Sequence, residues 1–267
     1  MSKTRLRGIE MAYDTEGSGP AVVLLHGYPF NRSMWREQME ALQGNFRVLA
    51  PDLRGLGETE ASAAEEPATM DEMARDVAAL MDELKINRAV IGGLSMGGYV
   101  ALAFARRFPL RVRALVLADT RPQADTDDAR RAREEQARKV LKEGMSAISD
   151  GFLKKVLAPA TLRERPEIVA RVRRMIEGTK SEGAAAALRG MAARIDQTGF
   201  LPSILAPTLI FVGSEDQLTP PADAEIMRRE IRGSRLEIIA GAAHVSNIER
   251  PSEFNRSLME FLRALLP

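Results

Sequence analysis

The pentapeptide Gly-Leu-Ser-Met-Gly at residues 93–97 places Ser95 in the G-x-S-x-G pattern of catalytic serines. It joins a short apolar run, Arg88–Gly92, to an apolar segment, Gly97–Phe108, which we expect to be a buried helix that ends before Pro109. A serine on a sharp strand-to-helix turn exposes its hydroxyl. The residues two positions before and after it must be small, because the turn presses them together. Glycine at both positions meets that need, so we predict Ser95 to be a nucleophile.

A serine hydroxyl needs an adjacent base that accepts its proton during attack, and histidine is the usual base. The chain has two histidines, His26 and His244. Where a serine sits on this kind of turn, the acid and then the histidine follow it along the chain. We therefore predict that His244, after the last apolar run, is the general base. His26 is expected to anchor its own loop.

A carboxylate must hold the imidazole in the correct tautomer and stabilise the imidazolium that forms. Asp216 lies between the serine and the predicted base, three residues after the apolar run Thr208–Gly213. We predict that Asp216 is the acid. Asp119, at the end of another apolar run, is the rival, and Glu215 is a weaker candidate. Asp52 precedes the serine and is expected to tie down its own loop.

Acyl transfer also needs two donors that face the developing oxyanion. The Met96 amide is one candidate, because it lies at the positive end of the helix that follows the serine. The second comes from the sequence His-Gly-Tyr-Pro at residues 26–29, which follows the apolar run Ala21–Leu25. Pro29 has no N–H, so we predict the Tyr28 amide. A cis form of Pro29 would hold that amide in place.

Short runs rich in Val, Ile and Leu alternate with helical patterns, which indicates an α/β fold with a mostly parallel sheet covered on both faces. The clearest runs are Ala21–Leu25, Arg47–Pro51, Arg88–Gly92, Ala114–Asp119, Thr208–Gly213 and Arg235–Ala240. An antiparallel hairpin before Tyr13 would make eight strands. Amphipathic spacing predicts a helix over Thr69–Lys85. The Ala- and Glu-rich stretch Ala61–Ala68 is expected to be an exposed loop.

The alternation stops after Asp119 and resumes at Thr208. The sequence between them favours helices, among them the run Glu182–Leu188, and it contains no strand-like run. Residues 121–200 carry 17 Lys and Arg against 12 Asp and Glu, which we interpret as a solvated helical face rather than an anion-binding surface. We predict a core of residues 1–120 and 204–267 and a helical cap of residues 121–203 over one end of the sheet.

The composition excludes several classes of function. The 38 Lys and Arg against 37 Asp and Glu give a net charge of +1, so no global field attracts nucleic acid or an anionic membrane. The absence of cysteine and the presence of two histidines exclude thiolate chemistry and a multi-histidine metal site. We expect no metal and no organic cofactor. No apolar stretch is long enough for a membrane span or a secretory signal, so a cytoplasmic protein is expected.

Five segments together resemble the α/β-hydrolase superfamily, and within it the small esterase, enol-lactonase and cofactor-free haloperoxidase group. They are HGYP at 26–29, PDLRGLG at 51–57, GLSMGG at 93–98, VGSED at 212–216 and GAAHVSNIERP at 241–251. The resemblance implies an α/β-hydrolase fold with a catalytic triad of Ser95, Asp216 and His244. Members that hydrolyse epoxides or haloalkanes have Asp as nucleophile, so the serine here argues against both reactions.

The expected function is hydrolysis of small to medium carboxylic esters through an acyl-enzyme, with a small ester or lactone as the only expected partner. Residues 109–125 and 243–247 are similar to 3-oxoadipate enol-lactonases, which leaves lactone hydrolysis open. Pro29 resembles the haloperoxidases of this fold, in which peroxide intercepts the acyl-enzyme. A ligand receptor on the same fold is the alternative from a different class.

Overall fold

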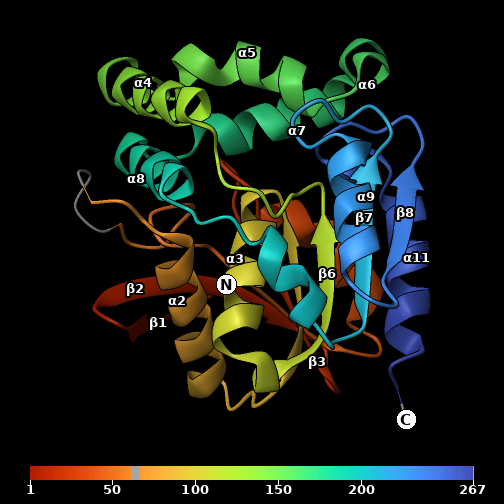
Figure 1. Ribbon diagram of the computed structural model, residues 1–267. Helices are drawn as coiled ribbons and strands as arrows, with labels where there is room; N and C mark the ends of the chain where they lie inside the picture. The colour runs from red at the N-terminus through yellow and green to blue at the C-terminus, as the bar shows by residue number, and fades with distance from the viewer. Residues whose placement is uncertain (62–65, 267) are drawn as a thin grey trace.

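The computed structural model describes residues 1–61 and 66–266 and places them in one sheet flanked by helices (Figure 1). Residues 62–65 belong to the stretch predicted as an exposed loop, and they lie outside the described residues. At the end of that stretch the prediction is wrong. Ala68 is buried, and its amide donates to the Ala186 carbonyl at 3.0 Å, so the chain is held against another element there.

The sheet has eight strands, which confirms the predicted number. They are β1 (Ser2–Leu6), β2 (Ile9–Glu16), β3 (Ala21–Leu25), β4 (Arg47–Pro51), β5 (Ala89–Leu94), β6 (Val112–Ala118), β7 (Thr208–Gly213) and β8 (Arg235–Ile239). Their order is β1-β2-β4-β3-β5-β6-β7-β8. The pairs β1–β2 and β2–β4 are antiparallel and all others are parallel. The central strands β3 and β5 are neighbours, so the loops after them meet at one edge.

The burial of the strands explains why they could be recognised in the sequence. Strands β3, β5 and β7 are buried along their whole length, as expected for parallel strands covered on both faces. The predicted boundaries shift by up to two residues at β5 and β6. Strand β5 continues to Leu94 because its ladder with β6 runs on to the Leu94–Ala118 pair. The opening hairpin extends to Glu16 because β2 also pairs with β4.

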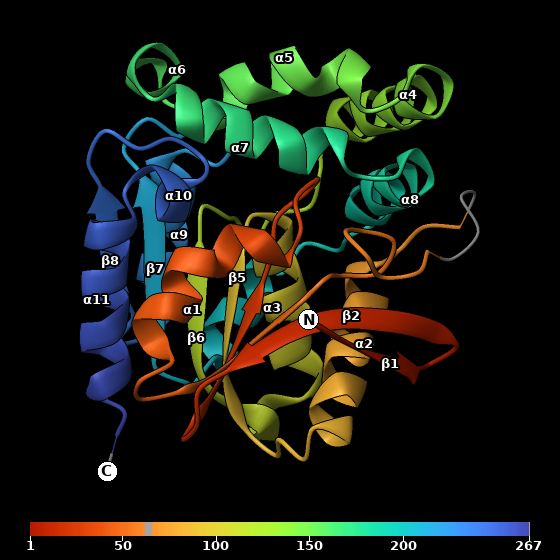
Figure 2. The same ribbon diagram turned by 180° about the vertical axis from the view of Figure 1, so that it is seen from behind.

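Helices cover both faces of the sheet. The helices outside the segment between β6 and β7 are η1 (Arg32–Trp35), α1 (Arg36–Leu42), α2 (Met70–Glu83), α3 (Met96–Arg107), η2 (Pro109–Arg111), α9 (Pro221–Glu230), α10 (Ser246–Glu249) and α11 (Pro251–Arg263). Figure 1 shows α2, α3 and α9 on one face, and Figure 2 shows α1 and α11 on the other.

Two of these helices match the predicted ones closely. Helix α2 begins after Thr69, whose hydroxyl accepts from the Glu72 amide while the Glu72 carboxylate accepts from the Thr69 amide. This reciprocal capping box satisfies two amides that lack intrahelical partners. Helix α3 begins at Met96, directly after Ser95, and is buried along most of its length. Helix α3 therefore places its amino-terminal end at the predicted nucleophile.

Five helices and a 3₁₀ helix separate β6 from β7. They are α4 (Asp127–Glu143), α5 (Ser146–Val156), α6 (Pro159–Glu164), α7 (Pro166–Glu177), α8 (Ser181–Ala192) and η3 (Thr198–Ser203). In both ribbon views α4 to α8 lie over one end of the sheet, the end at which the parallel strands finish (Figures 1 and 2). This helical layer therefore lies over the loops that carry the predicted catalytic residues.

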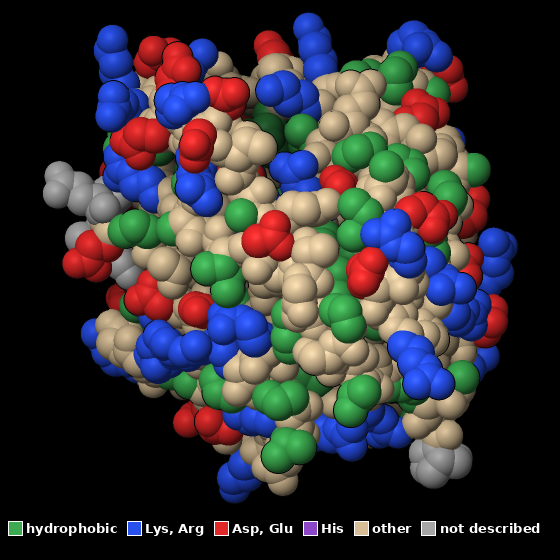
Figure 3. All heavy atoms as spheres, in the orientation of Figure 1, with side chains coloured by type: hydrophobic (Ala, Val, Ile, Leu, Met, Phe, Trp, Pro, Cys, Tyr) green, Lys and Arg blue, Asp and Glu red, His purple; other side chains and the backbone are tan. Residues whose placement is uncertain are grey.

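The buried apolar side chains form one cluster that includes residues of the core and of the helices above it. Phe254 of α11 stacks on Phe211 of β7, with ring centroids 4.0 Å apart, and Trp35 lies 6.2 Å from the Phe254 ring. Positive and negative side chains alternate over the surface that Figure 3 shows, as the net charge of +1 suggests. Among the described helices, none is both long and apolar enough to cross a bilayer.

Candidate active site

Ser95 occupies the junction of β5 and α3 in a conformation that L-residues rarely adopt, with φ 55° and ψ −116°. The glycines on either side make this turn sterically possible. A Cβ on Gly93 would lie 2.1 Å from the Gly97 carbonyl oxygen, and a Cβ on Gly97 would lie 2.1 Å from the Leu25 carbonyl oxygen. Side chains at either position would collide with backbone, so both positions require glycine.

The neighbouring Gly98 has a separate role. A Cβ there would lie 2.4 Å from the Thr120 hydroxyl, which donates to the Ser95 carbonyl oxygen at 2.8 Å. Thr120 follows β6, so this hydrogen bond ties the end of β6 to the serine turn. Gly98 leaves the room that Thr120 needs.

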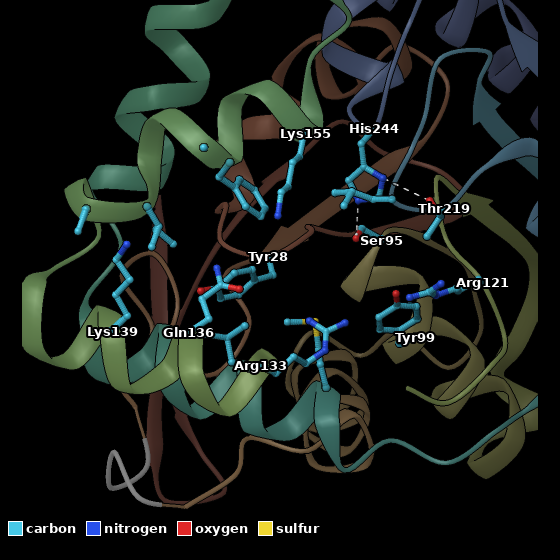
Figure 4. Close-up of a pocket in the computed structure, with 17 residues that line it drawn as sticks. Tyr28, Ser95, Tyr99, Arg121, Arg133, Gln136, Lys139, Lys155, Thr219 and His244 are labelled. Atoms are coloured by element: carbon cyan, nitrogen blue, oxygen red, sulfur yellow. Dashed lines mark hydrogen bonds between the residues drawn. The ribbon is translucent and has the colours of Figure 1, made fainter. Parts of the chain in front are cut away.

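The three side chains selected from the sequence lie in a hydrogen-bonded row. Ser95 Oγ is 2.8 Å from His244 Nε2, and His244 Nδ1 is 2.8 Å from Asp216 Oδ2 (Figure 4). Each comes from a loop at the carboxyl end of a different strand, β5, β8 and β7 respectively. In this geometry the Asp216 carboxylate holds a proton on Nδ1, which leaves Nε2 free to accept the serine proton.

The Asp216 carboxylate accepts further hydrogen bonds from its own loop. Its Oδ1 accepts from the amides of Leu218, at 2.8 Å, and Thr219, at 3.1 Å, and its Oδ2 accepts from the Thr219 hydroxyl at 2.7 Å. Burial alone would raise the pKa of Asp216, but His244 and these donors outweigh it and lower that pKa. Asp216 therefore stays ionised beside the imidazole. Thr219 was not selected from the sequence.

Opposing effects also act on His244, which is almost fully buried. Burial by itself would lower its pKa, but the negative charge of Asp216 and their hydrogen bond outweigh burial and raise it. The raised pKa means that the imidazolium formed during proton transfer is stabilised where it forms. This is the electrostatic condition for a histidine that accepts a proton from serine.

Asp119, the rival acid, lies near the same histidine and has other partners. Its Oδ1 accepts from the Gly213 amide at 2.8 Å, and its Oδ2 accepts from the Ser246 hydroxyl at 2.6 Å. Burial and the nearby Asp216 charge raise the pKa of Asp119 to about 8. Asp119 thus fastens the strand that leads to Asp216 and the segment that follows His244, without a hydrogen bond to the imidazole.

His26 and Asp52 have the loop-anchoring contacts that the sequence suggested. The Leu53 amide donates to His26 Nε2 at 2.9 Å, so the proton of the neutral ring is on Nδ1, which donates to the Gly27 carbonyl oxygen at 2.9 Å. Burial lowers the pKa of His26, which keeps the ring neutral. The Asp52 carboxylate accepts from the amides of Arg32 and Glu58, at 2.7 and 2.8 Å.

The two amides predicted to face an oxyanion lie on loops in contact with each other. A Cβ on Gly27 would lie 3.4 Å from Ser95 Cβ, so the loop that carries Tyr28 packs against the serine turn. The Tyr28–Pro29 peptide bond is cis. Within the part of the chain that the structure describes, neither the Tyr28 nor the Met96 amide donates to another protein group. Both amides are available to a ligand oxygen.

The loop of His244 is also fastened to the helical layer above it. The His244 amide donates to the Val156 carbonyl oxygen, at 3.1 Å, where α5 ends. The buried carboxylate of Glu249 accepts from the Ala243 amide at 2.7 Å and from the Ala158 amide at 2.9 Å. Glu249 therefore bridges the residue before the histidine and the start of α6. The motif at residues 241–251 contains Glu249, but no feature of the sequence assigns it this role.

A cavity of about 370 Å³ lies over Ser95 and His244, between the sheet and the helices (Figure 4). Besides these two residues it is lined by Tyr28, Tyr99, Arg121, Arg133, Gln136, Lys139, Ala147, Ile148, Gly151, Phe152, Lys155, Leu188, Met191, Leu218 and Thr219. Most of these residues come from α4, α5 and α8. The basic side chains of this lining were not identified from the sequence, because a charged helical residue has the same pattern whether it faces a cavity or solvent. Among the described residues, no three His, Cys, Asp or Glu side chains gather as a metal site would require.

A family model for the alpha/beta hydrolase fold matches residues 20–251. The chain belongs to this family. The α/β-hydrolase fold and the group predicted from the five motifs are thereby confirmed. Of relatives with known names, 3-oxoadipate enol-lactonase 2 of Acinetobacter baylyi is 30% identical over 252 residues, 94% of this chain and 92% of the enol-lactonase.

Solved structures of other α/β hydrolases superpose along nearly the whole chain. A thermophilic esterase from Thermogutta terrifontis, with malate bound, is 40% identical with a TM-score of 0.94, covering 98% of this chain and 97% of the esterase. The enol-lactonase from Burkholderia xenovorans LB400 is 32% identical with a TM-score of 0.91, covering 98% of this chain and all of the enol-lactonase. This α/β hydrolase is therefore similar to enzymes named for two kinds of acyl chemistry.

Proposed function

We propose that this α/β hydrolase is a serine carboxylic-ester hydrolase that works through an acyl-enzyme. The observation that carries the proposal is the hydrogen-bonded row of Ser95, His244 and Asp216 beneath the cavity between the sheet and the helical layer. Similarity to a named esterase supports ester substrates. Small to medium esters fit a cavity of about 370 Å³.

In the proposed mechanism, Ser95 Oγ attacks the ester carbonyl while His244 Nε2 accepts its proton. The tetrahedral oxyanion receives hydrogen bonds from the amides of Tyr28 and Met96, which have no other acceptor among the described residues. His244 then donates the proton to the departing alcohol, and the Ser95 acyl ester remains. Water attacks this ester with His244 again as base, which releases the acid and restores the serine. Asp216 holds the imidazole throughout.

We further propose that residues 121–203 form a cap and that residues 1–120 and 204–267 form the catalytic core. Three cap helices supply most of the cavity lining, whereas the proposed triad comes from the core. The cap would then determine which esters enter, and the core would perform the chemistry.

Hydrolysis of a lactone is the second candidate, because a ring ester requires the same attack and the same oxyanion donors. Similarity to two proteins named enol-lactonase favours it. Interception of the acyl-enzyme by peroxide is a third outcome of the same chemistry. A receptor without catalysis would bind a ligand over Ser95 and release no product.

The proposed function is tested with short p-nitrophenyl esters. The Ser95→Ala variant should lose roughly 10⁴- to 10⁶-fold in kcat, because the nucleophile is removed while the oxyanion donors stay in place. Ser252→Ala, an exposed serine of α11, is the matched control and should retain wild-type rates. The wild type should also give an acyl burst and a mass increase on Ser95. Tight ligand binding without any burst would support the receptor instead, and an active Ser95→Ala enzyme would contradict the nucleophile assignment.

A further inference from the structure

The cavity over Ser95 has a strongly asymmetric charge. Its lining includes four basic side chains, Arg121, Arg133, Lys139 and Lys155, and no Asp or Glu. The whole chain is nearly neutral, with a net charge of +1, so this excess is a property of the cavity rather than of the molecule. A cavity walled by one sign of charge attracts ligands of the other sign.

The two arginines are partly balanced by carboxylates outside the cavity. Arg133 forms an ion pair with the buried Asp125, whose pKa is lowered although burial opposes the charged form, because Arg133 and Arg194 surround it. Arg121 lies 3.9 Å from Asp125 and 3.8 Å from Asp223. Carboxylates of the protein itself therefore neutralise much of the positive charge of Arg121 and Arg133.

The two lysines have no such balance. Lys139 of α4 and Lys155 of α5 line the cavity at exposed positions, and neither pairs with a carboxylate within 4.0 Å among the described residues. Glu135 and Glu143 lie one helical turn to either side of Lys139, yet neither ion pair forms. Their ammonium groups are therefore available to a ligand in the cavity.

A second, independent observation comes from the Tyr28 side chain. Its hydroxyl is buried and has no hydrogen-bond partner in the described part of the chain, although it belongs to the cavity lining. Burial raises the pKa of this phenol, so it keeps its proton and can donate. Buried donors in proteins almost always have an acceptor, and an oxygen atom of a ligand in the cavity would supply it here.

These groups are arranged on one side of the nucleophile. Figure 4 shows Tyr28 between Ser95 and Gln136, with Lys139 beyond Gln136 and Lys155 approaching from α5. Arg133, Gln136 and Lys139 are three residues apart on α4, so they share one face of that helix. The cavity thus runs from the reacting serine to a distant end that offers hydrogen-bond donors and positive charge.

We propose that this end of the cavity binds a carboxylate of the substrate, held by Lys139 and Lys155 and by the Tyr28 hydroxyl. The enzyme then prefers esters that carry a free carboxylate several bonds from the ester carbonyl over neutral esters of the same length. This inference rests on the proposed ester hydrolysis and names its substrate class. It also revises the interpretation of the cap charges as a purely solvated face.

Matched substrates test the preference. In the first pair, monomethyl adipate carries a carboxylate at the end of its acyl chain where methyl hexanoate has a methyl group. In the second pair, 4-acetoxybutyrate carries a carboxylate at the end of its alcohol part where butyl acetate has a methyl group. The ratio of kcat/KM for the charged over the neutral ester should be about tenfold or more in at least one pair, with most of the effect in KM.

Variants then locate the effect. In Lys139→Gln/Lys155→Gln this ratio should fall about threefold to tenfold, as expected for two exposed ion pairs. Tyr28→Phe keeps the ring and the backbone amide, and its ratio should fall about tenfold. The matched control is Lys142→Gln/Lys154→Gln, which removes the same charge from the same two helices at positions outside the cavity lining. Its ratio should equal that of the wild type.

The possible results distinguish a failure of the carboxylate site from a failure of the proposed ester hydrolysis. If the wild type hydrolyses neutral esters as fast as charged ones in both pairs, the carboxylate site is overturned while ester hydrolysis stands. An equal fall of the ratio in both lysine pairs would also overturn it, since it would show a general charge effect. If no ester of either kind is hydrolysed, and p-nitrophenyl esters give no burst, the proposed function itself fails.

Discussion

Two buried aspartates surround His244, and their hydrogen bonds differ in kind. Asp216 contacts the imidazole at 2.8 Å, whereas Asp119 accepts from Gly213 and Ser246. Only a carboxylate that is hydrogen-bonded to Nδ1 can fix the tautomer that accepts the serine proton. At the scale of single residues, the proposed roles of the two aspartates therefore rest on their hydrogen bonds and not on their distance from the histidine.

Substitution of each aspartate by asparagine separates the two roles. Asp216→Asn should lower kcat by about 10⁴-fold, because the amide presents the wrong partner to Nδ1 and carries no charge to stabilise the imidazolium. Asp119→Asn should stay within about tenfold of the wild type, because the raised pKa of Asp119 makes its neutral form accessible near neutral pH. The measurement is kcat with a p-nitrophenyl ester, and equal losses in the two variants would contradict the assignment.

The pH dependence of the reaction depends on the same contact. In the proposed mechanism the neutral form of His244 is the base, so kcat/KM should fall as the pH decreases through the His244 pKa of the free enzyme. Burial lowers that pKa, but Asp216 outweighs it, so the acid limb should lie above the ordinary value of 6.5. In Asp216→Asn the residual activity should have its acid limb at lower pH. NMR titration of the two histidines checks this directly, because burial lowers the pKa of His26, which should titrate at lower pH than His244.

At the scale of elements, the loop after β8 is held in place by contacts with the helical layer. The His244 amide donates to the end of α5, and Glu249 bridges the Ala243 and Ala158 amides. The position of the base thus depends on α5 and α6 as well as on the sheet. A change in the position of these helices would therefore also move the loop that carries His244.

The Glu249→Gln variant tests this coupling. Glutamine has one acceptor oxygen, so its amino group would face one of the two amides and leave it without a partner, at a cost of about 1–3 kcal/mol in stability. We expect kcat to fall about tenfold with little change in KM, because His244 is displaced while the cavity lining is kept. The control is Glu253→Gln, which makes the same substitution at an exposed position of α11. Identical kinetics of the two variants would show that Glu249 has no positioning role.

At the scale of the whole molecule, the helical layer and the sheet share their apolar core. Buried residues of α4, α5, α7 and α8 belong to the same cluster as those of the strands. A shared core makes the two parts depend on each other for burial of their apolar surface. The proposed division into core and cap therefore need not correspond to two units of stability.

Equilibrium unfolding should show this dependence. The single tryptophan, Trp35, is buried beside α11, so its fluorescence reports on the core, whereas far-ultraviolet circular dichroism reports on all the helices, and α4 to α8 contribute about half of the helical residues. We expect the two signals to change at the same denaturant concentration, as in a single cooperative transition. A loss of dichroism that precedes the change in fluorescence would mean that the helical layer unfolds by itself.

The sequence by itself determined the fold class, most strand boundaries and the choice of Ser95 and His244. These features follow from local patterns, since buried parallel strands are apolar throughout and the tight turn at Ser95 requires glycines. The small number of histidines also helped the choice of the base, because the chain has two and one of them precedes the serine.

Only the tertiary structure shows that Asp216 contacts the imidazole and Asp119 does not, although both follow strands and both lie near His244. It also decided which basic side chains of the helical layer face the cavity, and which of these are balanced by carboxylates. The physical reason is that hydrogen bonds and ion pairs act over a few ångströms between residues far apart in the chain, such as Glu249 and Ala158. The packing of the chain determines which residues form these hydrogen bonds and ion pairs, and a local pattern in the sequence does not indicate that packing.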